Sequence, residues 1–325
     1  MKAVVYTKYG APDVLHIEEI EKPAPGDDEV LIKIHAAEVT KADCEMRSFR
    51  FAVKWFWLPL RLAFGLVRPR KKVLGGYFAG EVVSVGKDVT KFNKGDQVFG
   101  ATRLRLGAYG EYVCLPADYT IVQKPQNMSF EEAAAVPLGG LNALHFLRKA
   151  NVQAGEKVLV NGAGGSIGTF GVQISRAMGA EVTAVDSTIK EEMLRSIGAD
   201  QFIDYTREEF TKSGQTYDVI LSMVARSSYS GCIKALKPGG RYLIANPRLS
   251  DMLRSVFTSL FTDKTAIFAF AQEKEEELLA LKKMIEEGKI KSTVDKIYPP
   301  EQVAEAHRRV ETEQRLGTVV LSWRN

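Results

Sequence analysis

Residues 156–186 read EKVLVNGAGGSIGTFGVQISRAMGAEVTAVD, and this stretch decides the fold. The apolar run at 158–160 predicts a buried strand, and the run at 182–185 predicts a second one after an intervening helix. The turn between the first strand and the helix has the order Ala163-x-Gly165-x-x-Gly168. Strand, glycine-rich turn, helix and strand in this order indicate a dinucleotide-binding βαβ unit.

The turn and the end of the second strand supply the residues expected to hold a dinucleotide. Glycines permit a tight turn, a close approach of the backbone to a pyrophosphate, and close packing of helix on strand. The helix offers free N–H groups and the positive end of its dipole to the phosphates. Asp186 lies about 20 residues on, where an acid holds ribose hydroxyls. The candidate contacts in the turn are Gly162, Ala163, Gly164, Gly165, Ser166, Ile167 and Gly168.

Composition places the chain among ordinary globular proteins. Its 325 residues exceed what one core usually absorbs, so two domains are expected. The formal net charge is +4, and no basic run interleaved with aromatic residues indicates nucleic-acid binding. The three cysteines are isolated, which excludes a disulfide framework. The first residues predict a strand and no signal peptide, so we expect a cytoplasmic protein.

The organisation of the chain changes near residue 129. Before it, short alternating runs broken by glycine and proline predict a β-rich domain. Ser129 and Glu132 form a capping-box pattern that begins a helix. From residue 157 to about 246, strands alternate with helices, which predicts an α/β domain with a parallel sheet.

Segments outside the glycine turn point to one family: MKAVVYTKYG at 1–10, GEVVSVGKDVTKFNKGDQVFG at 80–100, GAYGEYVCLPA at 107–117, LKPGGRY at 236–242 and GTVVLSW at 317–323. With them the chain resembles the medium-chain dehydrogenase/reductase superfamily, specifically its zinc-free quinone oxidoreductase-like branch. The resemblance implies an α/β protein with a GroES-like β-rich catalytic domain and a Rossmann domain with a doubly wound parallel sheet. The expected bounds are 1–125, completed by 265–325, for the first domain and 126–264 for the second.

The positions that carry zinc ligands in related enzymes lack them here. Zinc-dependent members have an early cysteine and a later GHE segment; the matching positions are Thr40 and residues 75–77, which read GGY. Cys44 lies four residues past the first position, and no histidine is placed in the sequence to activate it, so we interpret Cys44 as a small buried residue. The four histidines are scattered. A catalytic zinc needs about three protein ligands, so no metal is expected.

The resemblance implies hydride transfer from NAD(P)H to a quinone or an α,β-unsaturated carbonyl without a metal. Thr40 and Asn246 are expected beside the nicotinamide ring. Tyr77, Thr40 and Cys44 are the candidates for the proton donor. Tyr77 is preferred because a phenol can donate a proton; the alternative for Tyr77 is a packing aromatic residue beside Phe78. Two other readings stay open: a zinc-free alcohol or carbonyl dehydrogenase, and a cofactor-binding structural or regulatory protein with little turnover.

The sequence gives conflicting signals for the cofactor. Asp186 favours NADH because a carboxylate binds the ribose 2′-hydroxyl and repels a 2′-phosphate. Lys190 and Tyr205 match positions where NADP-dependent relatives contact that phosphate, and Ser187 is a further donor. Both residues also have an interpretation without cofactor binding: Lys190 as a solvated residue, and Tyr205 as a cap on residues 203–204. We therefore expect NAD(P)H, with NADPH implied by the resemblance.

Two apolar segments, 49–66 and 251–271, flank the expected cleft. Arg50, Lys54, Pro59 and Arg61 interrupt the first segment, which excludes a membrane span. One interpretation is a pocket for a small apolar quinone or enone; another is packing or a subunit interface in a homodimer. A third is peripheral contact with an anionic membrane through the basic residues between 47 and 72.

Overall fold

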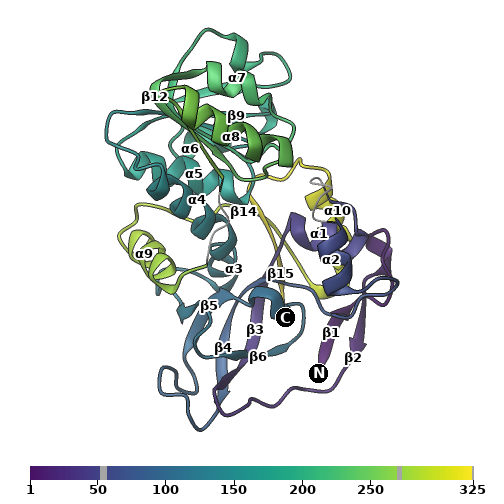
Figure 1. Cartoon of the computed structure of the whole chain (residues 1–325). Helices are drawn as coiled ribbons and strands as arrows, with labels where there is room; N and C mark the ends of the chain where they lie inside the picture. Colours follow the sequence, from purple (N-terminus) through teal and green to yellow (C-terminus); the bar gives the residue numbers. More distant parts are fainter. Residues whose placement is uncertain (52–56, 269–272, 324–325) are drawn as a thin grey trace.

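The structure of the protein is a computed structural model, and it describes residues 1–51, 57–268 and 273–323. Figure 1 shows two bodies, with a parallel sheet and its helices in the upper one and a β-rich sheet in the lower one. The yellow C-terminal part of the chain runs from the junction of the two bodies into the lower one. The fold class predicted from the sequence is confirmed.

The upper sheet has six strands in the order β10-β9-β8-β11-β12-β13, all parallel. Counted from β8 this order is 3-2-1-4-5-6, and it reverses between β8 and β11, where such folds bind dinucleotides outside the carboxyl ends of the strands. The strands are β8 (Lys157–Asn161), β9 (Glu181–Asp186), β10 (Gln201–Asp204), β11 (Tyr217–Ser222), β12 (Leu236–Ile244) and β13 (Thr265–Phe268).

One feature of this sheet differs from the expectation. β13 begins at Thr265 and pairs with β12, so the sheet continues four residues beyond the domain boundary expected at 264. A four-residue strand inside an apolar aromatic run has too little pattern to be recognised.

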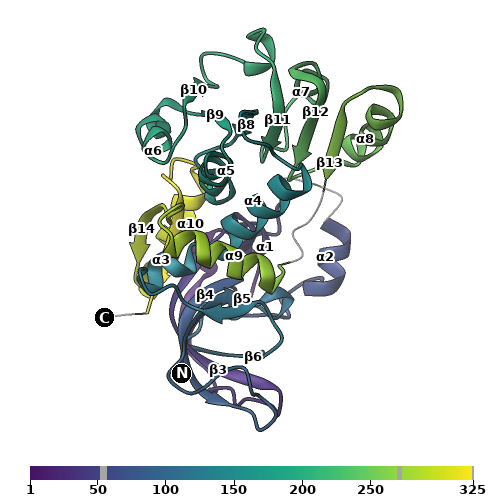
Figure 2. The ribbon, with the colours of Figure 1, turned by 90° about the vertical axis from the view of Figure 1, so that its left-hand side faces the viewer.

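Helices cover both faces of the parallel sheet (Figures 1 and 2). Val158, Leu159 and Val160 of β8 are completely buried, as a strand covered on both faces requires. Helix α9 packs on α4, where a Cβ on Gly140 would come within 2.8 Å of Leu281. The elements are α4 (Pro137–Lys149), α5 (Ser166–Ala177), η4 (Thr188–Lys190), α6 (Glu191–Ser196), η5 (Phe210–Lys212), α7 (Tyr229–Lys234), α8 (Leu249–Phe261) and α9 (Glu275–Glu286).

The lower sheet has the order β14-β15-β3-β4-β5-β7, and β6 also pairs with β3. β15 lies antiparallel to β3, so the end of the chain returns to this sheet. The strands are β3 (Glu29–Val39), β4 (Tyr77–Val85), β5 (Gln97–Ala101), β6 (Tyr112–Pro116), β7 (Ile121–Gln123), β14 (Val294–Tyr298) and β15 (Thr318–Ser322), beside the pair β1 (Lys2–Val5) and β2 (His16–Glu19).

Short helices connect the strands of the lower body. The capping box predicted at Ser129 and Glu132 is confirmed, with both reciprocal hydrogen bonds at the start of α3. The elements are η1 (Pro12–Val14), α1 (Lys41–Ser48), α2 (Trp57–Phe64), η3 (Arg103–Arg105), α3 (Phe130–Ala134), η6 (Pro300–Gln302) and α10 (Val303–Glu311).

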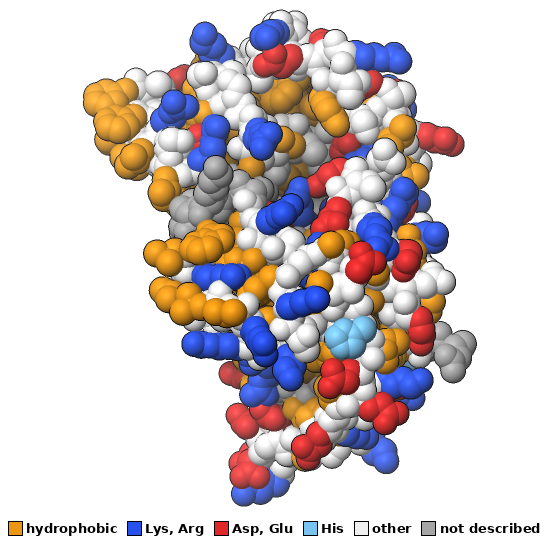
Figure 3. Space-filling model, turned by 90° about the vertical axis from the view of Figure 1, so that its right-hand side faces the viewer, with side chains coloured by type: hydrophobic (Ala, Val, Ile, Leu, Met, Phe, Trp, Pro, Cys, Tyr) orange, Lys and Arg blue, Asp and Glu red, His pale blue; other side chains and the backbone are white. Residues whose placement is uncertain are grey.

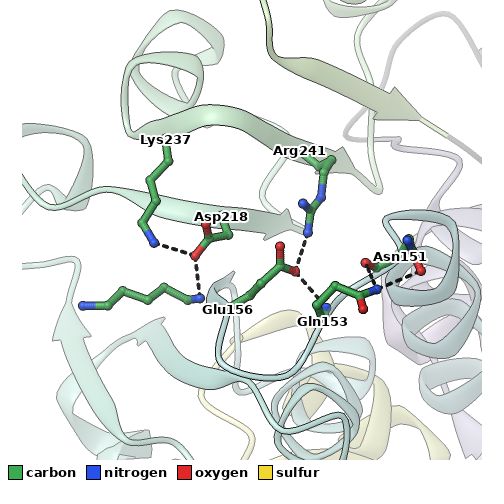
Figure 4. A network of polar contacts seen from close by, with 7 residues as sticks. Asn151, Gln153, Glu156, Asp218, Lys237 and Arg241 are labelled. Atoms are coloured by element: carbon green, nitrogen blue, oxygen red, sulfur yellow. Dashed lines mark hydrogen bonds and ion pairs between the residues drawn. The ribbon is translucent and has the colours of Figure 1, made fainter.

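A polar network joins the amino ends of three parallel strands (Figure 4). Arg241 donates to Glu156 at 2.5 Å, and Asp218 accepts from the Lys237 ammonium at 2.7 Å and from the Lys157 backbone N–H at 2.8 Å. Partly exposed pairs of this kind each contribute about 0.2–1 kcal/mol. The network lies at the end of the sheet opposite the glycine turn, so we assign it to the fold and not to the site.

Candidate nucleotide site and the residues facing it

The glycine turn forms a backbone cradle at the carboxyl end of β8. Gly162 has φ +84°, and helix α5 begins at Ser166 after Gly165 as its N-cap. A Cβ on Gly168 would lie 2.3 Å from the Gly162 carbonyl oxygen and 2.5 Å from that of Ala163. Only glycine therefore lets the first turn of α5 approach the loop this closely. The free N–H groups at this helix start face the space beyond the strand ends.

Asp186 is held by donors of the chain itself. Its Oδ2 accepts from the Gly164 N–H at 2.8 Å, and its Oδ1 accepts from the Ser187 N–H at 2.9 Å. The Lys190 ammonium lies 3.0 Å from Oδ1, and both side chains are more than 90% buried. The Lys190 stem crosses Gly164, where a Cβ would meet its Cδ at 2.2 Å. The two residues that argued for different cofactors are thus paired with each other.

Tyr205 and Asn246 lie at the same edge of the sheet and are more exposed. The Tyr205 side chain is 61% exposed, and its backbone N–H donates to the Asp186 carbonyl oxygen at 3.2 Å. Asn246 donates from Nδ2 to the Met223 carbonyl oxygen at 2.8 Å, which links the ends of β12 and β11. Both are available to a ligand lying along the carboxyl edge.

Arg315 is a site residue that sequence reasoning missed. Its side chain is buried, and its Nη2 would lie 3.7 Å from a Cβ on Gly165. Its Nε has no hydrogen-bond partner within the described residues. The Gly317 N–H donates to the Gly164 carbonyl oxygen at 3.1 Å, which fixes the segment that carries Arg315 against the loop. A cation beside the positive end of a helix dipole is unfavourable unless a bound anion contacts both the cation and the helix end. No local pattern marks this residue, because it lies 150 positions from the glycine it faces.

Glu38 of β3 reaches the same helix start from the lower body. It is completely buried, and one carboxyl oxygen accepts from the Ser166 hydroxyl at 2.6 Å. Burial raises the pKa of Glu38 to about 8, although the Ser166 hydrogen bond and the Arg315 charge oppose the shift. Glu38 is therefore mostly uncharged at neutral pH, which leaves Arg315 and the dipole of α5 as a net positive site.

Replacing Glu38 by glutamine is expected to remove a pH-dependent loss of stability. The native pKa lies above the ordinary 4.5, so the native state holds the proton more tightly than the unfolded chain. The contribution of Glu38 to the unfolding free energy is therefore complete below about pH 4.5 and falls as the pH rises to about 8, by roughly 1.4 kcal/mol per unit of pKa difference. Thermal unfolding without cofactor at pH 6 and pH 9 measures it. The Glu38→Gln advantage grows at pH 9, whereas the exposed control Glu18→Gln follows the parent; parallel curves for both variants would contradict the assignment.

The two hydroxyl candidates for the proton donor, Thr40 and Tyr77, donate hydrogen bonds to carboxylates. Thr40 caps α1, and its hydroxyl donates to Asp43 at 2.6 Å. Asp43 also accepts from the Gly75 N–H at 3.1 Å, two residues before Tyr77. The Tyr77 hydroxyl donates to Glu273 at 2.8 Å. Burial, then the Glu273 charge, raises the pKa of Tyr77 well above its ordinary value, so the hydroxyl keeps its proton.

Glu273 is a second residue of the candidate site that no sequence motif indicated. It precedes α9 and lies 196 positions from Tyr77. Burial raises the pKa of this carboxyl, and the hydrogen bond from Tyr77 only partly offsets the shift. The pair therefore places a protonated phenol beside a carboxyl group of raised pKa at the boundary of the two bodies.

The interpretation of Cys44 needs one correction. A histidine does lie beside it, because His307 of α10 places Nδ1 3.3 Å from the Cys44 Sγ. On its other side His307 lies 3.4 Å from the Tyr109 hydroxyl. Burial raises the pKa of the thiol and lowers that of His307 to about 3, so both groups are neutral at physiological pH. The pair is packed as a neutral contact and supplies no thiolate.

The positions related to zinc ligands, Thr40 and residues 75–77, carry no thiolate or imidazole in the structure. Over the described ranges, no group of three His, Cys, Asp or Glu side chains is arranged to hold a metal ion. His35 stacks on Phe130, His145 contacts Glu277 and His307 contacts Cys44, so these histidines occupy separate places.

The two apolar segments form helices with exposed faces. Residues 52–56 of the first segment and 269–271 of the second lie outside the described residues. The described parts contain α2, α8 and β13. In the part of the chain that the structure describes, no helix has the length and hydropathy needed to cross a bilayer.

Family models and known proteins match parts of both bodies. A family model described as an alcohol dehydrogenase GroES-like domain matches residues 26–126, and one described as a zinc-binding dehydrogenase matches 197–321. A 2-methylene-furan-3-one reductase of Solanum lycopersicum is 32% identical over 99% of this chain and 79% of its own length. An NADPH-dependent alkenal/one oxidoreductase of Arabidopsis thaliana, a chloroplastic protein, has the same identity and coverage. The quinone oxidoreductase structure of Coxiella burnetii superposes with a TM-score of 0.88 at 29% identity and covers 100% of this chain and 99% of its own.

Proposed function

The chain belongs to the medium-chain dehydrogenase/reductase superfamily, in its quinone oxidoreductase-like branch, and from this membership we propose that it reduces quinones or α,β-unsaturated carbonyls with NAD(P)H. The observation that carries the proposal is the glycine cradle at the start of α5 with the Arg315 side chain against it, whose Nε has no hydrogen-bond partner among the described residues. When bound, the nicotinamide cofactor supplies the hydride. The relatives named above act on enones and quinones, which are electrophilic at the carbon that accepts hydride.

The residues of the chain have three proposed tasks. The loop at 162–168 and Arg315 bind the pyrophosphate through backbone N–H groups and one cation. We assign Thr40 and Asn246 to the nicotinamide side of the bound cofactor, as the resemblance implies. Tyr77 holds a proton on its hydroxyl beside Glu273, from which an oxygen of the reduced substrate would receive it. In this proposal no metal takes part in catalysis. We further propose a cytoplasmic homodimer with a small apolar substrate.

The main test measures the oxidation of NADPH and NADH by a panel of quinones and alkenals. The absorbance of the reduced nicotinamide monitors the reaction. Turnover with at least one acceptor is expected. Tight cofactor binding without turnover on any acceptor would favour the second candidate, a cofactor-binding protein with structural or regulatory use. That candidate has one observation in its favour, since both hydroxyl candidates for the proton donor already donate to carboxylates. Turnover of alcohols or simple ketones alone would instead indicate an alcohol or carbonyl dehydrogenase.

Removing the Tyr77 hydroxyl is expected to lower kcat and leave KM nearly unchanged. General acids contribute roughly 10²–10⁴-fold, so Tyr77→Phe should lose about a hundredfold in kcat for an enone acceptor. The control is Tyr112→Phe, a half-buried tyrosine of the same body whose ring lies under the Lys22 ammonium. If kcat of Tyr77→Phe stays within twofold of the parent, Tyr77 is a packing residue and the proton comes from elsewhere.

The buried Asp186–Lys190 pair predicts opposite shifts of cofactor preference from its two members. Asp186→Asn frees the Lys190 ammonium for a 2′-phosphate, so the ratio of kcat/KM for NADPH over NADH should rise about tenfold. Lys190→Met frees the carboxylate for the 2′-hydroxyl and should lower the same ratio about tenfold. Lys149→Met, an exposed lysine at the end of α4, is the control. Shifts in the same direction for both variants would show that the pair supports the loop and does not select the cofactor.

A further inference from the structure

The last residues of β3 bring one carboxyl side chain into the junction of the two bodies. Glu38 and Thr40 are two positions apart in extended backbone, so their side chains lie on the same face of the strand. Glu38 pairs with Val320 of β15 in the lower sheet, and its side chain reaches Ser166, the first residue of α5. This side chain therefore connects the lower sheet to the helix whose start is proposed to hold the pyrophosphate.

The surroundings of Glu38 fit a neutral carboxyl group. Figure 3 shows Asp and Glu side chains spread over one face of the molecule, where water solvates their charges, whereas Glu38 has no exposed surface. Its Oε1 accepts from the Ser166 hydroxyl at 2.6 Å, and its Oε2 has no hydrogen-bond partner within the described residues. The Nε of the nearby Arg315 also has no partner there, so these two atoms do not bond each other. A buried carboxylate with a single donor is costly, which favours the protonated form.

Four charged or titratable groups face Glu38 from other elements. Burial has the largest effect on the pKa of Glu38 and raises it; the Arg315 charge lowers this pKa, and the Asp43 charge from α1 raises it further. Tyr77 of β4 and Tyr109, which precedes β6, sense the charge of Glu38 in turn. Burial raises the pKa of both phenols well above the ordinary value, so both keep their protons. Glu38 is therefore the group that exchanges a proton with solvent near neutral pH at this place.

The remaining elements packed on β3 have partners of their own. β6 pairs with residues 29–33, at the other end of β3 from Glu38, and β15 carries no titratable side chain. Helices α3 and α10 also pack on β3, and their charged or titratable side chains contact other residues. The contacts are Glu131 with Ser322, Glu132 with Ser129, Glu305 and Asp13 with Arg308, His307 with Cys44, Arg309 with Asp295, and Glu311 with Arg47.

We propose that Glu38 is a positioning residue for the cofactor and that it serves in its neutral form. The carbonyl oxygen of the neutral group accepts from Ser166 and fixes the first residue of α5, while no negative charge opposes the pyrophosphate. Release of the proton to solvent places a carboxylate beside the same helix start. There it competes with the pyrophosphate for Arg315 and for the positive end of the α5 dipole, so the cofactor binds less tightly. This role rests on the proposed function, because it requires that a nicotinamide nucleotide binds at the loop 162–168.

Titration of NADH and NADPH binding against pH, followed by nicotinamide fluorescence, tests this role. The pKa of Glu38 is about 8 in the free protein, and a bound pyrophosphate raises it further, so the complex keeps the proton. The dissociation constant of the parent should be level up to about pH 7 and then rise, by about fivefold to tenfold between pH 7 and pH 9. Glu38→Gln keeps a neutral carbonyl oxygen for Ser166. It should bind like the parent at pH 7 and stay level up to pH 9.

Proton uptake is a readout that a packing role of Glu38 would not change. At pH 8 about half of the free molecules carry the proton, so binding of NADH should take up as much as about half a proton per molecule. Calorimetric titration in two buffers of different ionisation enthalpy measures this uptake, and Glu38→Gln should lose it. Ser166→Ala removes a hydrogen bond that lowers the pKa of Glu38, so its loss of affinity should begin at a higher pH than that of the parent.

Glu277→Gln is the matched control. Glu277 is also a buried carboxyl group with one oxygen unpartnered among the described residues, but it lies beside His145 of α4. Its pH curve should follow that of the parent. Parallel curves for Glu38→Gln and the parent, or tighter binding by the parent as the pH rises, overturn the role of Glu38 and leave the cofactor site intact. If Glu38→Gln does not fold, an unshifted curve of Ser166→Ala overturns it. Failure of both parent and Glu38→Gln to bind either nucleotide at any pH overturns the nucleotide site itself and this role with it.

Discussion

Gly168→Ala is expected to abolish cofactor binding, with a dissociation constant for NADPH at least a hundredfold higher than that of the parent. A Cβ at this position would lie 2.3–2.6 Å from backbone atoms of Gly162 and Ala163. Backbone atoms cannot rotate away as a flexible side chain can, so α5 must move away from the loop. The N–H groups at the start of α5 then no longer point toward the phosphates. Overpacking of this kind costs about 1–3 kcal/mol, so the melting temperature should also fall by several degrees.

Gly165→Ala is the matched control for this prediction. A Cβ there would make only ordinary contacts, 3.7 Å from Arg315 Nη2 and 3.9 Å from the Gly162 carbonyl oxygen. Its melting temperature should equal that of the parent, while the methyl group occupies space that a phosphate needs and weakens NADPH binding about tenfold. Calorimetric titration and thermal unfolding of both variants distinguish loss of fold from loss of access. Parent-like NADPH affinity in Gly168→Ala would show that the loop does not hold the cofactor.

The elements that the sequence predicted well are those whose pattern is local. The strands predicted from the apolar runs at 158–160 and 182–185 lie within β8 and β9, and the Ser129 capping box forms as its spacing required. The alternation of strands and helices from residue 157 predicted a parallel sheet, and that sheet forms. The sequence did not predict β13, nor that α8 turns its apolar side chains outward. An apolar run does not tell which of its side chains face solvent.

The candidate site was predictable only in its contiguous part. The sequence marked Asp186 and Lys190 as separate contacts, and nothing in it indicated that Lys190 crosses Gly164 to pair with Asp186. Arg315 and Glu38 meet the helix start from distant segments of the other body. Such contacts depend on how the two sheets face each other, which no local pattern encodes.

Arg315→Met is expected to weaken NADPH binding about tenfold to a hundredfold, the cost of one hydrogen bond to a charged group. Arg315→Lys should recover part of the loss, because an ammonium supplies the charge without the planar fork. Arg148→Met, an exposed arginine of α4, is the control. Fluorescence titration at two salt concentrations measures the affinities, and the parent should show the stronger salt dependence.

A second readout tests whether the Arg315 charge acts at the helix start. The Arg315 charge lowers the pKa of Glu38, against the larger effect of burial. Without this charge the Glu38 pKa should rise above about 8, so the stability of Arg315→Met should keep falling with pH beyond the point where that of the parent levels off. A variant that loses affinity with an unchanged pH profile would mean that the guanidinium contacts the cofactor without sensing Glu38. Unchanged affinity would overturn the assignment of Arg315 to the pyrophosphate, and the cation would then serve only to offset Glu38 and Asp295, the two carboxyl groups whose pKa it lowers in the free protein.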